Sequence, residues 1–151
     1  IATDIVVVAN RLPVIWKRRD NGLHEVSVAP GGLVSALTPV VEQLRCVWVG
    51  WDSGEPEESL RINGMELVSV RADQDLYEQY YQGFANQILW PIFHGLSEYA
   101  ADANSVAQVE SWWSAYREMN QIFAARVAEV AQPGALIWVQ DYHLLLVPGL
   151  L

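Results

Sequence analysis

Arg11, Asp141 and the pair Gly31-Gly32 stand where predicted strands give way to loops or to a helix. Ligands bind beyond the carboxyl ends of parallel strands, so these positions are candidates for a binding site. A planar guanidinium holds a phosphate through two hydrogen bonds. Glycines before a helix let free backbone N–H groups approach a diphosphate, and a carboxylate accepts hydrogen bonds from sugar hydroxyls or helps steer a proton.

Each of these residues also has an ordinary structural explanation. Arg11 could pair with a nearby carboxylate, because buried charges are usually paired. Gly31-Gly32 could form a simple turn, and Asp141 could cap the helix that follows it. His94 and His143 are more typical of hydrogen-bonded structural histidines than of catalytic ones, so the sequence alone leaves these alternatives open.

The elements that must position these residues follow from hydrophobic periodicity. We expect strands at Ile5–Ala9, Cys46–Trp51, Met65–Val70 (antiparallel or at an edge) and Leu136–Gln140. A hairpin of Val14–Lys17 and His24–Val28 is expected around the turn Asp20-Asn21-Gly22, and a surface loop over Asp52–Ser59. Helices are expected over Val34–Leu44 (kinked at Pro39), from Asp73 or Asp75 to about Tyr81, over Gln87–Phe93 and from the cap Asn104-Ser105 to Pro133-Gly134. Leu136–Gln140 is expected to be buried. Alternating strands and helices predict a parallel α/β sheet with right-handed crossovers.

The segment Gln79–Ser97 contains no charged residue and is rich in aromatic side chains and amides. Polar groups interrupt it, and Gly83 and Pro91 are expected to break its helix, so it does not resemble a membrane span. Aromatic rings and amides are what a sugar pocket uses, because rings cover C–H faces and amides pair with hydroxyls. An aromatic core segment is the alternative explanation.

The composition excludes some classes of partner. The 151 residues carry a net charge of -9, which argues against nucleic acid as a partner. The single cysteine, Cys46, cannot form an internal disulfide, which favours a reducing compartment and a cytoplasmic location. No signal peptide or membrane span is apparent, and we interpret the chain as part of a longer protein.

Metal binding is not indicated by the sequence. Asp73-Gln74-Asp75 matches an Asp-x-Asp motif, but it precedes a helical pattern, where a capping role is more typical. The three histidines lack the spacing of metal ligands.

Six short motifs, taken together and in order, resemble the N-terminal part of the trehalose-6-phosphate synthases over nearly the whole chain. They are Asn10-Arg11-Leu12-Pro13, Pro30-Gly31-Gly32-Leu33, Trp48-Val49-Gly50-Trp51, the run Tyr80–Asn86 with Leu89-Trp90-Pro91 and Phe93-His94, the helix residues Tyr116, Asn120 and Phe123, and Trp138–Leu144. The resemblance implies a retaining glycosyltransferase of GT-B architecture, in which two Rossmann-like domains face a cleft. Residues 1–151 would form an incomplete N-terminal, acceptor-side domain, without the C-terminal nucleotide-sugar domain.

The family's activity is transfer of glucose from UDP-glucose to glucose 6-phosphate, giving α,α-trehalose 6-phosphate and UDP, with no cofactor or metal. The resemblance leaves a homo-oligomer open. By position, Arg11 would bind the acceptor's phosphate, and Tyr81 and Asp141 would line the acceptor site, with Asp141 as the catalytic residue. Trp90 would select the anomer of the acceptor, and Gly31 and Gly32 would contact the donor through their backbone N–H groups.

Gln140 departs from the family pattern, because many members carry His there; we expect its side chain to point away from the site and the change to have little effect. Two other functions fit the same motifs. One is a catalytically silent relative that senses sugar phosphates or regulates a partner. The other is a sister transferase that uses another phosphorylated acceptor.

Overall fold

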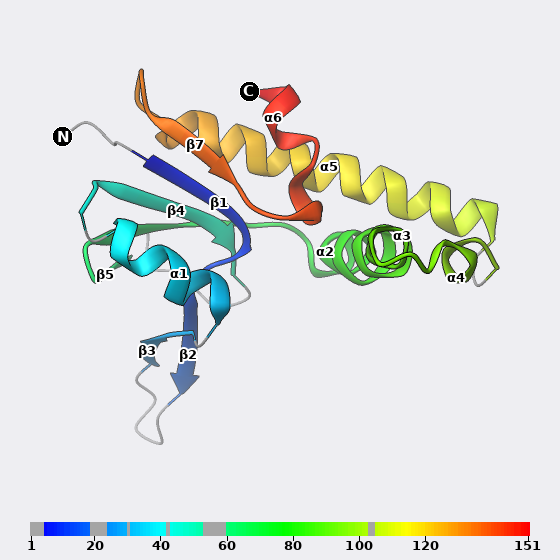
Figure 1. Cartoon of the computed structure of the whole chain (residues 1–151), viewed down its shortest axis with the longest axis horizontal. Helices are drawn as coiled ribbons and strands as arrows, with labels where there is room; N and C mark the ends of the chain where they lie inside the picture. The colour runs from blue at the N-terminus through cyan, green and yellow to red at the C-terminus, as the bar shows by residue number, and fades with distance from the viewer. Residues whose placement is uncertain (1–4, 19–23, 30, 42, 53–59, 103–104) are drawn as a thin grey trace.

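A five-stranded sheet forms the centre of the molecule. The computed structural model describes residues 5–18, 24–29, 31–41, 43–52, 60–102 and 105–151. The strand order is β5-β6-β4-β1-β7 (Figure 1). The strands are β1 (Ile5–Arg11), β4 (Cys46–Trp51), β5 (Leu60–Ile62), β6 (Met65–Val70) and β7 (Leu136–Val139), and all are parallel to their neighbours except β5, which is antiparallel to β6.

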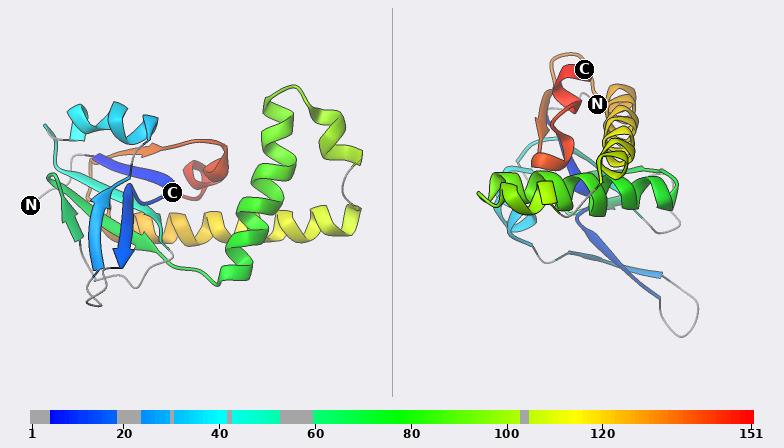
Figure 2. Two further views of the ribbon diagram at one scale, coloured as in Figure 1. Left: turned by 90° about the horizontal axis from the view of Figure 1, so that it is seen from below. Right: turned by 90° about the vertical axis from the view of Figure 1, so that its right-hand side faces the viewer.

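Helices cover both faces of this sheet, because alternate residues of its central strands are apolar on both sides. Val6 and Val8 of β1 face the long helix α5 (Val106–Val130), in one core cluster with Val49 of β4. Ile5 and Val7 face α1 (Gly32–Val41) in a second cluster that includes Leu37. Figure 2 shows α1 and α5 on opposite sides of the sheet, which confirms the predicted Rossmann-like α/β arrangement.

Two strand predictions differ from the structure. The strand expected to be antiparallel or at an edge, β6, is antiparallel to β5 and parallel to β4. It is not an edge strand, because β5, which the sequence did not reveal, pairs with its outer side. β7 is not buried: it lies at the other edge, and Leu136 is 63% exposed. A continuous apolar run is typical of a strand covered on both faces, but here part of the run lines an open groove on the surface.

The predicted hairpin is present as β2 (Val14–Arg18) and β3 (His24–Val28), with Val14 opposite Val28. It projects away from the main sheet (Figure 1). The first helix ends at Val41 rather than Leu44 and contains Pro39. The predicted turn Asp20-Asn21-Gly22, Pro30, Asn104 and residues 53–59 of the predicted loop lie outside the described residues.

The segment without charged residues is helical without a break from Gln79 to Phe93, contrary to prediction. α2 (Gln74–Glu78), the π-helical η1 (Gln79–Leu89) and α3 (Trp90–Phe93) follow one another with helical backbone angles at both junctions. Figure 2 shows this continuous helix crossing α5. Gly83 does not break it but permits close packing: a Cβ there would lie 2.6 Å from the indole of Trp112 on α5. Pro91 is the second residue of α3 and does not break the continuous helix either.

The long helix α5 begins as predicted, with the Ser105 hydroxyl accepting a hydrogen bond from the Gln108 N–H. Its apolar stripe is buried from Ala115 to Val127, but Val106 is 76% exposed and does not belong to it. Three short elements complete the fold: α4 (Ser97–Asp102), the 3₁₀ helix η2 (Tyr142–Leu144) and α6 (Val147–Leu150). Among the described helices, none combines the length and the apolar character needed to cross a membrane.

Candidate functional site

A cavity of about 250 Å³ opens at the carboxyl ends of β1 and β7, where a parallel sheet of this type binds ligands. It brings together two of the residues predicted to bind ligand, Arg11 and Asp141, although 130 positions separate them in the sequence. The residues lining it are Ala9, Asn10, Arg11, Leu12, Pro13, Ala29, Val34, Trp48, Gln140, Asp141 and His143.

An irregularity at the end of β1 directs the polar side chains of this site. The pairing of β1 with β4 shifts between Val8 and Arg11, as in a β-bulge. In a regular strand, neighbouring side chains point to opposite faces, whereas here Asn10 and Arg11 both reach the hydroxyl of Tyr77. Gly50 on β4 allows the bulge, because a Cβ there would lie 2.5 Å from the carbonyl carbon of Arg11.

The hydroxyl of Tyr77 on α2 is the meeting point of this network. It accepts hydrogen bonds from Nδ2 of Asn10 (3.0 Å) and from Nε of Arg11 (3.3 Å). The Tyr80 hydroxyl donates to Oδ1 of Asn10 at 2.9 Å. The indole of Trp51 stacks on Tyr77 at a centroid distance of 3.7 Å and an angle of 9°. The sequence does not indicate that Asn10, Tyr77 and Trp51 belong to the site, because their convergence depends on the bulge and on helix packing.

The guanidinium of Arg11 lies 5.1 Å from the ring centroid of Tyr81, in a cation–π contact. The hydrogen bond to Tyr77 raises the pKa of Arg11, although burial opposes this. Within the part of the chain that the structure describes, Arg11 forms no ion pair, so pairing with a carboxylate is not its explanation here. Its terminal nitrogens have no hydrogen-bond partner among these residues and remain available to an anion.

Asp141 fills the capping role that the sequence left open. Its carboxylate accepts a 2.7 Å hydrogen bond from the backbone N–H of Tyr142, at the start of η2. Its φ of 70° is uncommon for a residue other than glycine and is typical of functional sites. Capping uses one acceptor position of an exposed carboxylate, so Asp141 keeps acceptor capacity toward the cavity.

Two residues of α5 fix the loop that carries Asp141. The Tyr116 hydroxyl donates to the carbonyl of Tyr142 and accepts from the N–H of Leu145. The buried side chain of Asn120 donates to the carbonyl of His143 and accepts from the N–H of Leu146. The two side chains therefore form hydrogen bonds with four backbone groups of this loop that a helix or sheet would otherwise pair.

His143 stacks on Tyr142 (4.1 Å) and on Tyr81 (5.4 Å) and is 9% exposed. Neither ring nitrogen has a hydrogen-bond partner among the described residues, and burial lowers the pKa of His143 from its usual value, which disfavours the charged ring. Burial and stacking are consistent with the predicted structural role of His143, but the hydrogen bonds expected of it are missing among the described residues. Gln140 lines the cavity, contrary to the expectation that its side chain points away from the site, and its Nε2 is also buried without a partner among the described residues.

Gly31, Gly32 and Trp90 are not among the residues that line this cavity. Both glycines are exposed, and the Gly31 carbonyl accepts the first hydrogen bond of α1, from the N–H of Ser35. Trp90 is 41% exposed and stacks on His94 at 4.0 Å, while Nδ1 of His94 lies 2.7 Å from the Trp90 carbonyl oxygen. The two glycines proposed to contact the donor, and the indole of Trp90, are therefore exposed to solvent outside the Arg11 cavity.

Asp73 caps α2, since its carboxylate accepts from the N–H of Asp75. This is the structural role that the sequence favoured for the Asp-x-Asp motif. No group of three or more His, Cys, Asp or Glu side chains within the described ranges is arranged to hold a metal ion.

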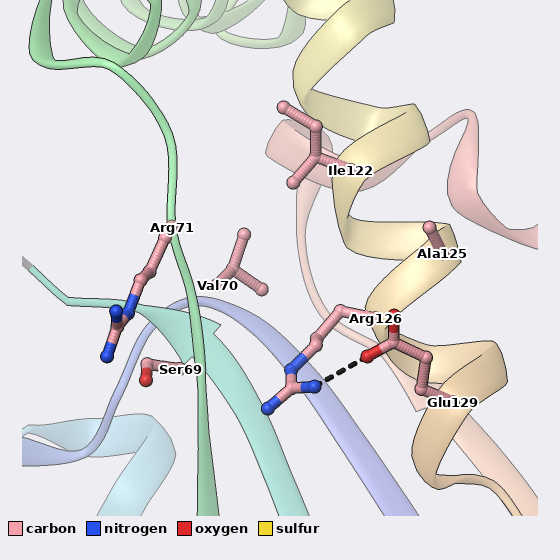
Figure 3. A pocket seen from close by; sticks show the side chains of 7 residues that line it. All are labelled: Ser69, Val70, Arg71, Ile122, Ala125, Arg126 and Glu129. Carbon is pink, nitrogen blue, oxygen red and sulfur yellow. Dashed lines mark hydrogen bonds and ion pairs between the residues drawn. The ribbon is translucent and has the colours of Figure 1, made fainter. Parts of the chain in front are cut away.

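Two other cavities have less suitable chemistry. One, of about 560 Å³, lies between the end of β6 and α5 (Figure 3). Its Arg126 is paired with Glu129, and no aromatic side chain is among the residues that line it. The second, of about 740 Å³, is an apolar groove along β7 and α6, with no charged residue. Neither combines an available cation, an acceptor and aromatic faces.

Comparison with known proteins identifies the family of the chain. The sequence matches the profile of glycosyltransferase family 20 over residues 3–151. The chain belongs to glycosyltransferase family 20. It is 40% identical, over 99% of its length, to a trehalose-6-phosphate synthase of Mycobacterium sp. (strain JLS). It is also 40% identical, over 97% of its length, to the UDP-forming α,α-trehalose-phosphate synthase 1 of Aspergillus niger.

Solved structures of this family have the same fold. The α,α-trehalose 6-phosphate synthase of Burkholderia multivorans matches 99% of the chain with a TM-score of 0.74 and 28% identity, and that of Burkholderia vietnamiensis matches 98% with a TM-score of 0.72. The family 20 chain described here covers about 30% of the Mycobacterium relative and 30% of the Burkholderia multivorans structure.

Proposed function

We propose that the complete protein transfers glucose from UDP-glucose to glucose 6-phosphate with retention of configuration, giving α,α-trehalose 6-phosphate and UDP. Relatives named as synthases of this type, at about 40% identity, support the proposal. Because this chain spans about 30% of their length, the nucleotide-sugar domain would come from residues outside the sequence described here.

The observation that carries the proposal is the arrangement around Arg11. A guanidinium whose terminal nitrogens have no partner among the described residues lies over the Tyr81 ring and shares one cavity with the carboxylate of Asp141. A sugar phosphate matches these groups: its phosphate would bind Arg11, and its hydroxyls would donate to Asp141. The cavity of about 250 Å³ has the size of a small ligand rather than a large one.

In this mechanism the residues of the chain bind and orient the acceptor. The donor bond from C1 to the phosphate oxygen stretches toward an oxocarbenium-like state while the acceptor hydroxyl attacks from the same face. The leaving phosphate oxygen takes the proton of that hydroxyl, so no protein nucleophile is needed. Asp141 would hold the acceptor, Trp90 would select its anomer, and the N–H groups of Gly31 and Gly32 would contact the donor. Catalysis then depends on positioning and charge stabilisation.

The test is UDP release by the complete protein with UDP-glucose and a panel of acceptors. Glucose 6-phosphate should be used far better than glucose or glycerol 3-phosphate, and the product should be α,α-trehalose 6-phosphate. Preferential use of glycerol 3-phosphate would identify a sister transferase. Tight binding of glucose 6-phosphate without UDP release would identify a silent sensor, and either result would contradict the proposal.

A further inference from the structure

The contacts of Tyr77 exceed what its packing requires. Its side chain is 3% exposed and its ring stacks on Trp51, and a phenylalanine could make the same packing contacts. Its hydroxyl instead accepts hydrogen bonds from Asn10 and from Nε of Arg11. Two hydrogen bonds on one buried oxygen define its position closely, and the stacking on Trp51 restrains the ring that carries it.

We propose that Tyr77 is a positioning residue that holds the guanidinium of Arg11 in the orientation needed to bind the phosphate of the acceptor. The inference rests on the proposed function, and it concerns a residue that does not itself line the cavity. Tyr77 takes up the one guanidinium nitrogen inside the chain, Nε, so that the two terminal nitrogens form the end presented to the anion.

The second support for the guanidinium is the Tyr81 ring, whose centroid lies 5.1 Å from the Arg11 carbon Cζ. A cation–π contact restrains the height of the group above the ring but leaves rotation about the ring normal nearly free. The hydrogen bond from Nε to Tyr77 removes that rotation. The Tyr81 ring thus supports the guanidinium of Arg11 from one face, and the Tyr77 hydroxyl fixes its rotation.

The network extends one step further from the cavity. The Tyr80 hydroxyl donates to Oδ1 of Asn10, which fixes the amide so that its Nδ2 points to Tyr77. The chain of contacts therefore runs from Tyr80 through Asn10 to Tyr77 and ends at Arg11. A flexible arginine loses side-chain entropy when it binds an anion, and a network that orders it beforehand reduces this cost.

The experiment compares Tyr77→Phe with the wild-type complete protein, since this change removes one oxygen and keeps the ring. We expect the KM for glucose 6-phosphate to rise about tenfold, as for loss of a hydrogen bond to a charged group, with kcat and the KM for UDP-glucose within about twofold. Tyr80→Phe should raise the same KM less. Tyr99→Phe, on an exposed ring of α4, is the matched control and should change nothing.

A second measurement does not depend on enzyme activity. In wild-type protein labelled with ¹⁵N-arginine, the Nε–H signal of Arg11, assigned by its loss in Arg11→Lys, should exchange with solvent more slowly than that of Arg117. Arg117 is the matched reference because its guanidinium also lies over a ring, that of Trp113, and its Nε has no hydrogen-bond partner among the described residues.

The results separate the two proposals. If the wild-type enzyme uses glucose 6-phosphate and Tyr77→Phe has an unchanged acceptor KM, the positioning role is wrong and the function stands. If the KM values for donor and acceptor rise together, the role of Tyr77 is only structural. If no acceptor releases UDP but the Arg11 Nε–H is protected, the proposed function fails and the positioning of Arg11 remains. Rapid exchange of that proton overturns the inference in every case.

Discussion

A Cβ on Gly50 would lie 2.5 Å from the carbonyl carbon of Arg11, closer than any real Cβ contact. The same segment is fixed by two further contacts: Nε1 of Trp48 donates to the Arg11 carbonyl at 3.2 Å, and the N–H of Leu12 donates to the Trp51 carbonyl. The backbone that carries the proposed phosphate ligand is therefore positioned by strand β4, which provides space at Gly50 and hydrogen bonds on either side.

Gly50→Ala should displace the bulge of β1 and with it the guanidinium of Arg11. The atoms in contact are backbone atoms, which cannot rotate away as a side chain can. We expect a loss of roughly 1–3 kcal/mol of stability, as for overpacking, together with a higher KM for the phosphorylated acceptor. Thermal unfolding and initial rates measure these two effects. Gly149→Ala is the control, since nothing lies within 4 Å of its added methyl group. A Gly50→Ala enzyme with wild-type acceptor KM would show that the bulge does not set the site.

Gly83→Ala should destabilise the protein without a selective rise in the KM for the acceptor. The new methyl group would lie 2.6 Å from the Trp112 indole, so the helix η1 and α5 must separate. The expected cost is again roughly 1–3 kcal/mol. Denaturant unfolding of this variant beside Gly149→Ala measures the cost, and equal midpoints for the two variants would disprove the close packing of η1 on α5.

Trp90→Ala should impair acceptor use more than folding. The indole is 41% exposed and its ring contact is with His94, so its removal should change stability by less than about 1 kcal/mol. If Trp90 selects the acceptor anomer, kcat/KM for glucose 6-phosphate should fall and the product should lose anomeric purity. Product analysis by NMR and a thermal melt decide between the roles. Unfolding of the variant at assay temperature would instead support a core role for this segment.

The pKa of His143 should lie below the ordinary value of about 6.5. Burial is the main cause, the positive charge of Arg11 acts in the same direction, and the negative charge of Asp141 opposes it. The unfolded chain then binds the proton more readily than the folded protein. The contribution of His143 to stability is therefore constant above about pH 6.5 and is lost as the pH falls from there through the folded pKa.

Titration of the His143 C2–H signal by NMR measures this pKa directly. Melting temperatures between pH 7.5 and 5.5 should fall more steeply for the wild type than for His143→Phe, which keeps an aromatic ring between Tyr81 and Tyr142. A measured pKa at or above 6.5, or parallel melting curves for the two proteins, would contradict the assignment.

Much of the central sheet could be predicted from the sequence, because β-branched runs reveal strands buried on both faces. Cys46–Trp51 and Met65–Val70 match β4 and β6 in both bounds. The short strand β5 has no comparable run, since its three residues alternate between partly buried and exposed. Similarly, the apolar residues of β7 did not reveal that the strand lies at an edge, because a pattern of apolar side chains does not show which other element, if any, covers them.

The candidate site could be predicted only in part. Arg11 and Asp141 could be brought together because both follow parallel strands, whose carboxyl ends meet at one edge of the sheet. The role of Tyr77 could not be predicted, because it depends on a shift in strand pairing that makes Asn10 and Arg11 point the same way. The continuous helix through Gly83 likewise depends on a tertiary contact, with Trp112, that local propensity does not contain.

The most direct test of the central claim is the kinetics of Arg11→Ala in the complete protein, with donor and acceptor varied separately. If Arg11 binds the acceptor's phosphate, kcat/KM for glucose 6-phosphate should fall by about 100-fold or more, as for loss of a charge-assisted pair of hydrogen bonds, while the KM for UDP-glucose stays within about twofold. Equal losses for the two substrates, or an unchanged preference for glucose 6-phosphate over glucose, would contradict the account.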